Sequence, residues 1–167
     1  MRAFADRAAH LYGLPPIHVL VSANPQSPAG LYRRGYFAVS ERTLSSSFRD
    51  AIVAHELAHY VLGHDAPLRG LSDAELKREY QQRELDANVK SVEILARAAR
   101  MSEERALRTV YDYLLSAHRA VERDPRLDLL GHKPPCEEIA DLLARFPDQR
   151  AWTAALECAP ASLRAGG

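Results

Sequence analysis

The sequence predicts an α+β fold, in which a small β-sheet precedes a predominantly helical body. Two short segments before residue 40 are rich in β-branched and aromatic residues, as strands are. Beyond them, long segments carry apolar residues at helical spacing and have recognisable start and stop signals. The chain has 167 residues, which is enough for a proper core, and no internal repeat, so we expect residues 1–167 to form a single domain.

The predicted sheet comes from residues 17–22 and 31–39. A short amphipathic helix over residues 2–12 precedes it, and a glycine and a Pro–Pro pair end this helix. IHVLVS at 17–22 is dominated by β-branched residues and predicts a strand, whereas NPQSPAG at 24–30 is typical of a turn. LYRRGYFAV at 31–39 predicts the second strand, and Gly35 weakens it or marks a bulge.

The helical body is predicted from the residues that start and stop helices. A serine stands at the expected start of each of the first three helices, and in the second it forms a capping box with a glutamate three residues later. A glycine ends the first helix, and acidic residues open the third and the fourth. The expected spans are residues 46–63, 72–100 and 103–123, a shorter helix from Pro135, and one more short helical stretch in the tail after Asp148.

The segment AIVAHELAHYVL, residues 51–62, carries the pattern on which the functional prediction depends. Apart from His55, Glu56 and His59 it is apolar almost all the way round, as expected of a helix inside a protein. Burying imidazoles and a carboxylate there costs several kcal/mol each unless a partner satisfies them. His55 and His59 lie one turn apart on one helix face, with Glu56 about 100° round from His55. H-E-x-x-H on a buried helix predicts one Zn²⁺ per chain with Glu56 as general base, and disfavours the alternative of two ordinary helix histidines.

Two residues compete as the third zinc ligand. Asp65 lies six residues beyond His59, where the longer H-E-x-x-H-x-x-G-x-x-H/D pattern has its ligand, but that pattern requires a glycine where this chain has Leu62. His64 is out of phase with the ligands and is expected to cap the helix C-terminus. Glu84 is favoured, because it lies in the middle of an inward stripe on the next helix and a buried carboxylate needs a partner. That stripe consists of Leu76, Tyr80, Glu84, Ala87, Ser91 and Ile94.

Charge and composition argue against several classes of protein. Lys plus Arg and Asp plus Glu number 22 each, so no net charge draws the chain to nucleic acid, and nucleic-acid binding is disfavoured. The apolar stretches fall far short of the ~20 residues of a membrane span. Asp6 and His10 interrupt the region where a signal peptide needs an apolar run. Cys136 and Cys158 are too few for a disulfide framework, so we expect reduced, buried thiols and a cytoplasmic location.

HELAHYVLGH followed by RELDANVKSVEILARA resembles the gluzincin metallopeptidases, whose second motif is E-x-E-A-D/N. The resemblance covers about residues 30 to 145 and implies a minimal zincin-like domain with Glu84 as the third ligand. GHKPPCEEIADLL resembles the H-P-P-x-E-E-R-I tail of the HtpX and CAAX-prenyl-protease branch, but Lys133 interrupts the His-Pro-Pro run and the arginine is absent. Asn88 and the short spacing from His59 to Glu84 are more similar to the ImmA/IrrE branch.

The predicted activity is zinc-dependent hydrolysis of peptide bonds in a peptide or protein substrate. Zinc lowers the pKa of its bound water towards ~7, and Glu56 takes the proton and passes it to the leaving amine. By resemblance to gluzincins, residues 35–39 are expected to offer an open strand edge to an extended substrate. The alternatives are an ImmA/IrrE-like protease specific for one regulatory partner, and a non-catalytic zinc-binding domain, against which Glu56 argues. The oxyanion stabiliser is expected to be His132 or one of three tyrosines, Tyr36, Tyr80 and Tyr111; the oligomeric state is not predicted.

Overall fold

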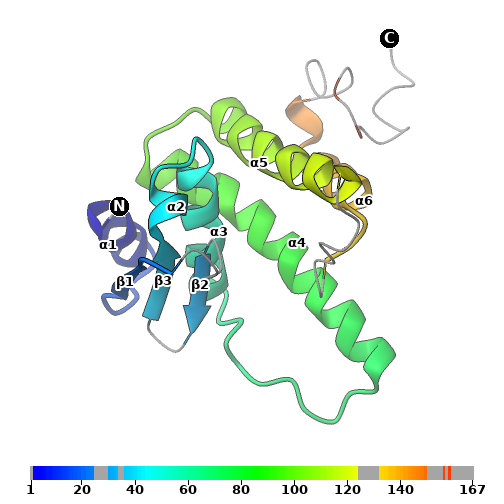
Figure 1. Cartoon of the computed structure of the whole chain (residues 1–167), viewed down its shortest axis with the longest axis horizontal. Helices are drawn as coiled ribbons and strands as arrows, with labels where there is room; N and C mark the ends of the chain where they lie inside the picture. Colours follow the sequence, from blue (N-terminus) through cyan, green and yellow to red (C-terminus); the bar gives the residue numbers. More distant parts are fainter. Residues whose placement is uncertain are drawn as a thin grey trace.

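The computed structural model describes residues 2–24, 30–33, 36–123 and 132–149, together with residues 156 and 158. The α+β class predicted from the sequence is confirmed, with a small sheet followed by helices. Figure 1 shows the sheet and the first helix on the left, the helices Glu103–Arg123 and Pro135–Ala144 on the upper right, and the helices Arg49–Val61 and Asp73–Ala98 in the middle. The elements are α1 (Arg2–Leu11), β1 (His18–Ser22), β2 (Gly30–Arg33), β3 (Tyr36–Ser40), α2 (Glu41–Leu44), α3 (Arg49–Val61), α4 (Asp73–Ala98), α5 (Glu103–Arg123), α6 (Pro135–Ala144) and the 3₁₀ helix η1 (Pro147–Gln149).

The sheet has three strands in the order β1-β3-β2, with β3 in the centre. β1 runs parallel to β3 and β2 runs antiparallel to it. The sequence predicted one strand over residues 31–39, and this prediction was wrong. β2 ends at Arg33, β3 begins at Tyr36 and the two strands run antiparallel, so this segment contributes two strands instead of one. Residues 34–35, and residues 25–29 of the predicted turn, lie outside the described part of the chain.

The central place of β3 overturns the prediction that residues 35–39 offer an open strand edge. Both sides of β3 are occupied, by β1 and by β2. Among the described strands, β2 pairs only with β3 and is therefore an edge strand. β2 also packs against α3. A Cβ added at Gly30 would lie only 2.8 Å from Cγ of Glu56 and 3.0 Å from Cγ2 of Ile52, so only glycine permits this close approach.

The helix starts agree with the sequence where a capping residue marks them. Ser72 and Glu75 form the predicted capping box of α4, and Ser102 accepts a hydrogen bond from the Arg105 backbone N–H at 3.3 Å in the first turn of α5. α3 begins at Arg49, a few residues later than predicted. Before it, Ser40 caps a short additional helix, α2, that the sequence did not predict. Most of the tail after Asp148, where the sequence predicted one more short helical stretch, lies outside the described residues. The described residues there contain the 3₁₀ helix η1.

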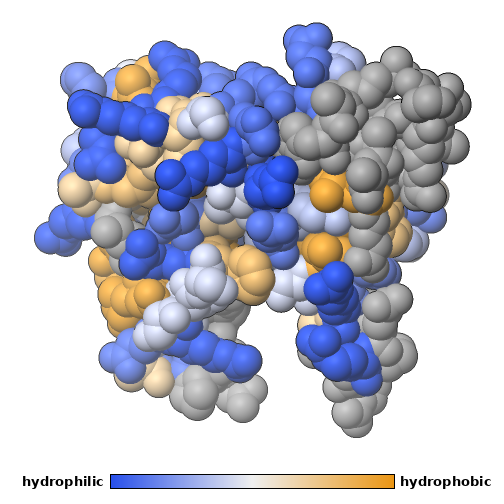
Figure 2. All heavy atoms as spheres, turned by 90° about the horizontal axis from the view of Figure 1, so that it is seen from above, coloured by the Kyte–Doolittle hydropathy of each residue, from blue (hydrophilic) through white to orange (hydrophobic). Residues whose placement is uncertain are grey.

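The core lies between the sheet and the helices, where α3 packs on α4, α4 on α5, and α5 on α6. The stripe predicted on α4 is buried from Ala87 onward, but Tyr80 is 45% exposed, since the first turns of α4 project beyond α3 (Figure 1). Hydrophilic side chains dominate the face seen in Figure 2, and hydrophobic residues appear there in small groups. None of the helices in the described ranges has the length and apolar character of a membrane span. The largest fully buried side chains include Phe37, Leu57, Ile94, Leu95, Leu107, Ile139, Leu142 and Leu143.

A disulfide joins Cys136, in the first turn of α6, to Cys158 in the C-terminal segment. The sequence analysis expected reduced, buried thiols. The structure differs on both points, since the two sulfurs are bonded and both residues are only partly buried. Folding brings residues that are 22 positions apart to a Cα–Cα distance of 5.0 Å, which the spacing of the cysteines alone does not reveal.

Candidate metal centre

The predicted zinc ligands meet where α3 crosses α4. Nε2 of His55 lies 3.1 Å from Nε2 of His59 and 3.0 Å from Oε2 of Glu84. Nε2 of His59 lies 3.6 Å from the same carboxylate oxygen. Two N or O ligands of one tetrahedral zinc are about 3.4 Å apart, so these three distances fit the edges of a zinc coordination tetrahedron. His55, His59 and Glu84 therefore form a group that could hold a metal ion.

The carboxylate of Glu84 supports this assignment independently of the spacing. Its Oε2 is buried, and unless the facing imidazoles carry a proton or a metal ion is bound, it has no hydrogen-bond donor among the described residues. An unsatisfied buried carboxylate oxygen is costly, and a cation between the donor atoms removes that cost. The nearby imidazoles hold the pKa of Glu84 well below its usual range, although burial opposes this effect. The side chain is therefore a carboxylate and available as a ligand.

The orientation of the His55 ring is fixed by two further side chains. Asn88 is fully buried, and its Nδ2 donates to Oε1 of Glu138 at 2.6 Å. Because a carboxylate can only accept, the amide of Asn88 must present its Oδ1 to the histidine. Nδ1–H of His55 then donates to that oxygen at 2.9 Å, so Nε2, the atom that faces Glu84, is the position that either a second proton or a metal ion can occupy. Such an outer partner is the usual means of orienting a metal-binding histidine.

His59 has an equivalent partner in His64. Their Nδ1 atoms are 2.9 Å apart. Burial, together with the charges of His59 and Arg83, lowers the pKa of His64 to about 4, so this ring is neutral and its Nδ1 can accept a hydrogen bond from Nδ1–H of His59. The loop that carries His64 is held in place by Arg83, which donates to the carbonyl of His64 at 2.6 Å and to that of Ala66 at 3.1 Å. The prediction that His64 caps the helix missed this contact.

The charges around the donor group favour a cation at its centre. Burial by itself lowers the pKa of His55, but the contact with Glu84 and the charges of Glu56 and Glu138 outweigh it and raise the pKa to about 9. A proton on His55 therefore stabilises the group in the absence of a metal. A divalent cation bound by the same atoms replaces that proton, which is the usual coupling between metal binding and ligand protonation.

Glu56 is not a member of the donor group, as expected for a general base. Its side chain lies against Gly30 at the start of β2, with Oε1 only 3.2 Å from the position of a Cβ there. The residue is half-buried, and its charge contributes to the raised pKa of His55. Its neighbour in sequence, His55, points instead towards α4.

His132 approaches the donor group from the segment before α6. Its Nε2 lies 3.6 Å from Oε2 of Glu84, and its Nδ1 lies 3.1 Å from Oε2 of Glu138. Burial lowers the pKa of His132, but the hydrogen bond and the charge of Glu138 outweigh it, so the net shift is upwards. Glu138 thus holds both His132 and, through Asn88, His55.

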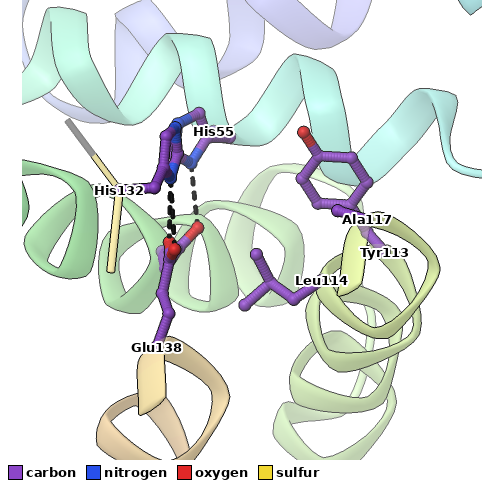
Figure 3. Close-up of a pocket in the computed structure, with 7 residues that line it drawn as sticks. His55, Tyr113, Leu114, Ala117, His132 and Glu138 are labelled. Atoms are coloured by element: carbon purple, nitrogen blue, oxygen red, sulfur yellow. Dashed lines mark hydrogen bonds and ion pairs between the residues drawn. The ribbon is translucent and has the colours of Figure 1, made fainter. Parts of the chain in front are cut away.

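A small cavity of about 70 Å³ opens beside His55 and His132. Figure 3 shows Glu138 below the two histidines, Leu114 opposite them, and the hydroxyl of Tyr113 pointing towards α3. Burial and the charges of Glu56, Glu138 and Glu84 raise the pKa of Tyr113 to about 12, so it keeps its proton and can donate it in a hydrogen bond. The cavity has room for a few water molecules next to the donor group.

The other residues singled out in the sequence lie elsewhere. Asp65, the competing third ligand, is exposed and is not part of the donor group. Of the three candidate tyrosines, Tyr36 is 51% exposed, Tyr80 is 45% exposed and Tyr111 is buried in the core. None of the three lines the cavity, whereas Tyr113, which the sequence analysis did not select, does.

Four residues that contact the donor group or line the cavity were not assigned to the site from the sequence. Asn88 follows Glu84 by four residues, so helical spacing alone could have placed it beside that ligand. No local pattern indicates the roles of His64, Glu138 or Tyr113, because their contacts depend on the packing of separate elements. Comparisons with protein-family models, with curated proteins and with solved structures found no match for this chain.

Proposed function

We propose that this chain is a zinc-dependent metallopeptidase of the gluzincin type, with His55, His59 and Glu84 as the zinc ligands. The observation that carries the proposal is the convergence of three donor atoms at 3.0–3.6 Å, with the other ring nitrogen of each histidine engaged. A site that only had to bind zinc structurally would have no use for the nearby carboxylate of Glu56.

Zinc held by these residues supplies a Lewis acid that polarises a carbonyl and lowers the pKa of water. Glu56 is the group that takes the proton from the attacking water, and it later delivers this proton to the leaving amine. Its position against Gly30 keeps it beside the edge strand, next to the scissile bond of a substrate bound there.

His132 is the proposed stabiliser of the oxyanion. Glu138 accepts from its Nδ1–H and favours the protonated ring, so that Nε2–H is free to donate to a developing negative charge. Nε2 of His132 lies 3.6 Å from Oε2 of Glu84, the carboxylate oxygen that the two histidine ligands also face. Tyr113, which lines the same cavity and keeps its proton, is the second donor available there.

The substrate is proposed to be a peptide in extended conformation, paired with the side of β2 that has no neighbouring strand among the described residues. β2 is the edge strand that contacts α3, and strand addition supplies main-chain hydrogen bonds without selecting for sequence. The sequence analysis placed the substrate at residues 35–39, which overlap the central strand β3; we propose the neighbouring strand β2 instead. A narrower version of the proposal, an ImmA/IrrE-like protease that cleaves one regulatory partner, uses the same catalytic groups.

Substitution of Glu56 by glutamine tests whether the chain is an enzyme. The variant keeps the size of the side chain but cannot act as a base, so it should bind zinc like the wild type while cleavage of an unfolded protein such as casein falls by about 10²–10⁴-fold. Glu104→Gln, at an exposed position on α5, is the matched control and should cleave like the wild type. Equal cleavage by the Glu56→Gln variant and the wild type would refute the proposed base. Zinc binding without cleavage by any of the three proteins would favour the non-catalytic zinc-binding domain.

A further inference from the structure

A second group of metal-binding side chains shares no residue with the first. It consists of His118 on α5, Cys136 in the first turn of α6, and Cys158 in the C-terminal segment. Their donor atoms all lie within 4.8 Å of one another, and each of the residues is partly buried. The proposed peptidase mechanism uses none of them.

The distance between the histidine and the nearer sulfur already suits a metal. Nε2 of His118 lies 3.6 Å from Sγ of Cys136. A thiolate at about 2.3 Å and an imidazole at about 2.0 Å from one tetrahedral zinc are also about 3.6 Å apart. In the disulfide form the sulfur can only accept a weak hydrogen bond from the ring nitrogen, whereas a thiolate and the same nitrogen are at the right distance to share a metal.

The position of Cys136 favours the thiolate that a metal requires. It is the second residue of a ten-residue helix, where the positive end of the helix dipole stabilises a negative charge. A thiolate stabilised in this way is also a better leaving group when another thiol attacks the disulfide. The same location therefore makes the disulfide reducible and the reduced cysteine a ligand.

We propose that reduction of the Cys136–Cys158 disulfide creates a second zinc site, with His118 as the third protein ligand. A dithiol reductant gives two electrons and two protons to the disulfide and becomes a disulfide itself. The two cysteine thiols then release two protons as their thiolates bind Zn²⁺, and Nε2 of His118 provides its lone pair. Two soft thiolates and one imidazole select zinc over magnesium or calcium, and the fourth position is left for water. Two thiolates bound to one tetrahedral zinc at about 2.3 Å are about 3.8 Å apart, so the two sulfurs have to separate to that distance.

The test is the zinc content of the protein before and after reduction with a phosphine, measured by mass spectrometry after removal of free metal. Reduction should add one zinc per chain to the wild type. The Cys136→Ser/Cys158→Ser double variant and the His118→Ala variant should gain none, and a circular-dichroism spectrum like that of the wild type shows that they are folded. Because the readout is the gain on reduction, it is independent of the proposed peptidase site. The His59→Ala variant should show the same gain.

Cobalt provides a second, spectroscopic readout of the ligands. Reduced wild type loaded with Co²⁺ should show the thiolate-to-cobalt charge-transfer absorption, and the double cysteine variant should not. An unchanged zinc content on reduction, or an equal gain in the double variant, would overturn the proposal. A full gain in the His118→Ala variant would remove the histidine from it.

Discussion

The donor group on α3 and α4 and the group around Cys136 contain similar residue types but are held differently by the fold. In the first, both histidines lie on one helix, and their Nδ1 atoms contact Asn88 and His64. In the second, the two sulfurs are bonded to each other and one of them comes from the C-terminal segment. The first group has its donor atoms ready for a metal, whereas the second has to break a covalent bond first.

This comparison indicates that supporting contacts decide when a set of ligands can bind a metal. The buried chain from His55 through Asn88 to Glu138 orients the first group whatever the redox state. In the second group the two sulfurs are bonded to each other, so we propose that this group binds a metal only after reduction. α6 contributes to both, since Glu138 lies two residues after Cys136.

The largest expected effect separates the two candidates for the third ligand of the first group. Glu84→Ala removes a ligand that lies 3.0 Å from Nε2 of His55, so we expect this variant to lose its zinc. Asp65→Ala removes an exposed side chain outside the group and should retain full zinc content. Metal analysis of the two oxidised variants decides between them, and the reverse result would assign the site to a different class of zinc peptidase.

A smaller effect is expected from the residue that orients His55. Asn88→Ala leaves all three ligands in place but removes the acceptor for Nδ1–H of His55, so zinc affinity should fall by about 10–100-fold. Asn24→Ala, at an exposed position, is the control and should leave the affinity unchanged. Competition with a chelator measures both affinities. Wild-type affinity in the Asn88→Ala variant would show that the ring needs no such support.

Gly30 tests whether β2 and Glu56 act together. A methyl group at this position would press on Cγ of Glu56 at 2.8 Å, and overpacking of this kind costs about 1–3 kcal/mol unless the side chain moves. We therefore expect Gly30→Ala to reduce cleavage of casein by roughly tenfold while the zinc content stays the same. Full activity would indicate that Glu56 can move freely and that the close approach has no functional role.

The smallest effect is predicted for removal of the disulfide, which should leave the zinc affinity of the first group unchanged. In the Cys136→Ser/Cys158→Ser double variant, the first group keeps every contact of its ligands, so its zinc affinity should equal that of the wild type. Chelator competition with the oxidised wild type and the double variant gives this comparison. A large loss of affinity in the double variant would mean that the disulfide supports both groups.

The sequence predicts the parts of this molecule that depend on local spacing. His55 and His59 are four residues apart on one helix, and Ser72 with Glu75 marks the start of the next helix, so both features can be predicted without knowledge of the fold. Glu84 could be selected because the helical stripe around it is local too. The structure brings these three potential ligands together.

The features that the sequence analysis missed depend on contacts between distant segments. Asn88 meets Glu138 across 50 positions, and the disulfide spans 22 positions. The strand predicted over residues 31–39 was wrong because pairing between β2 and β3, not residue preference, decides where the chain reverses. The error placed the edge of the sheet at residues 35–39, whereas β3 is the central strand.

The central claim is that one zinc ion is held by the donor group of α3 and α4. The most direct test is the zinc content of the oxidised wild type and of three single variants, His55→Ala, His59→Ala and, as control, His18→Ala at an exposed position of β1. The account predicts one zinc per chain in the wild type and in His18→Ala, and none in the other two. Full zinc content in both His55→Ala and His59→Ala would contradict it.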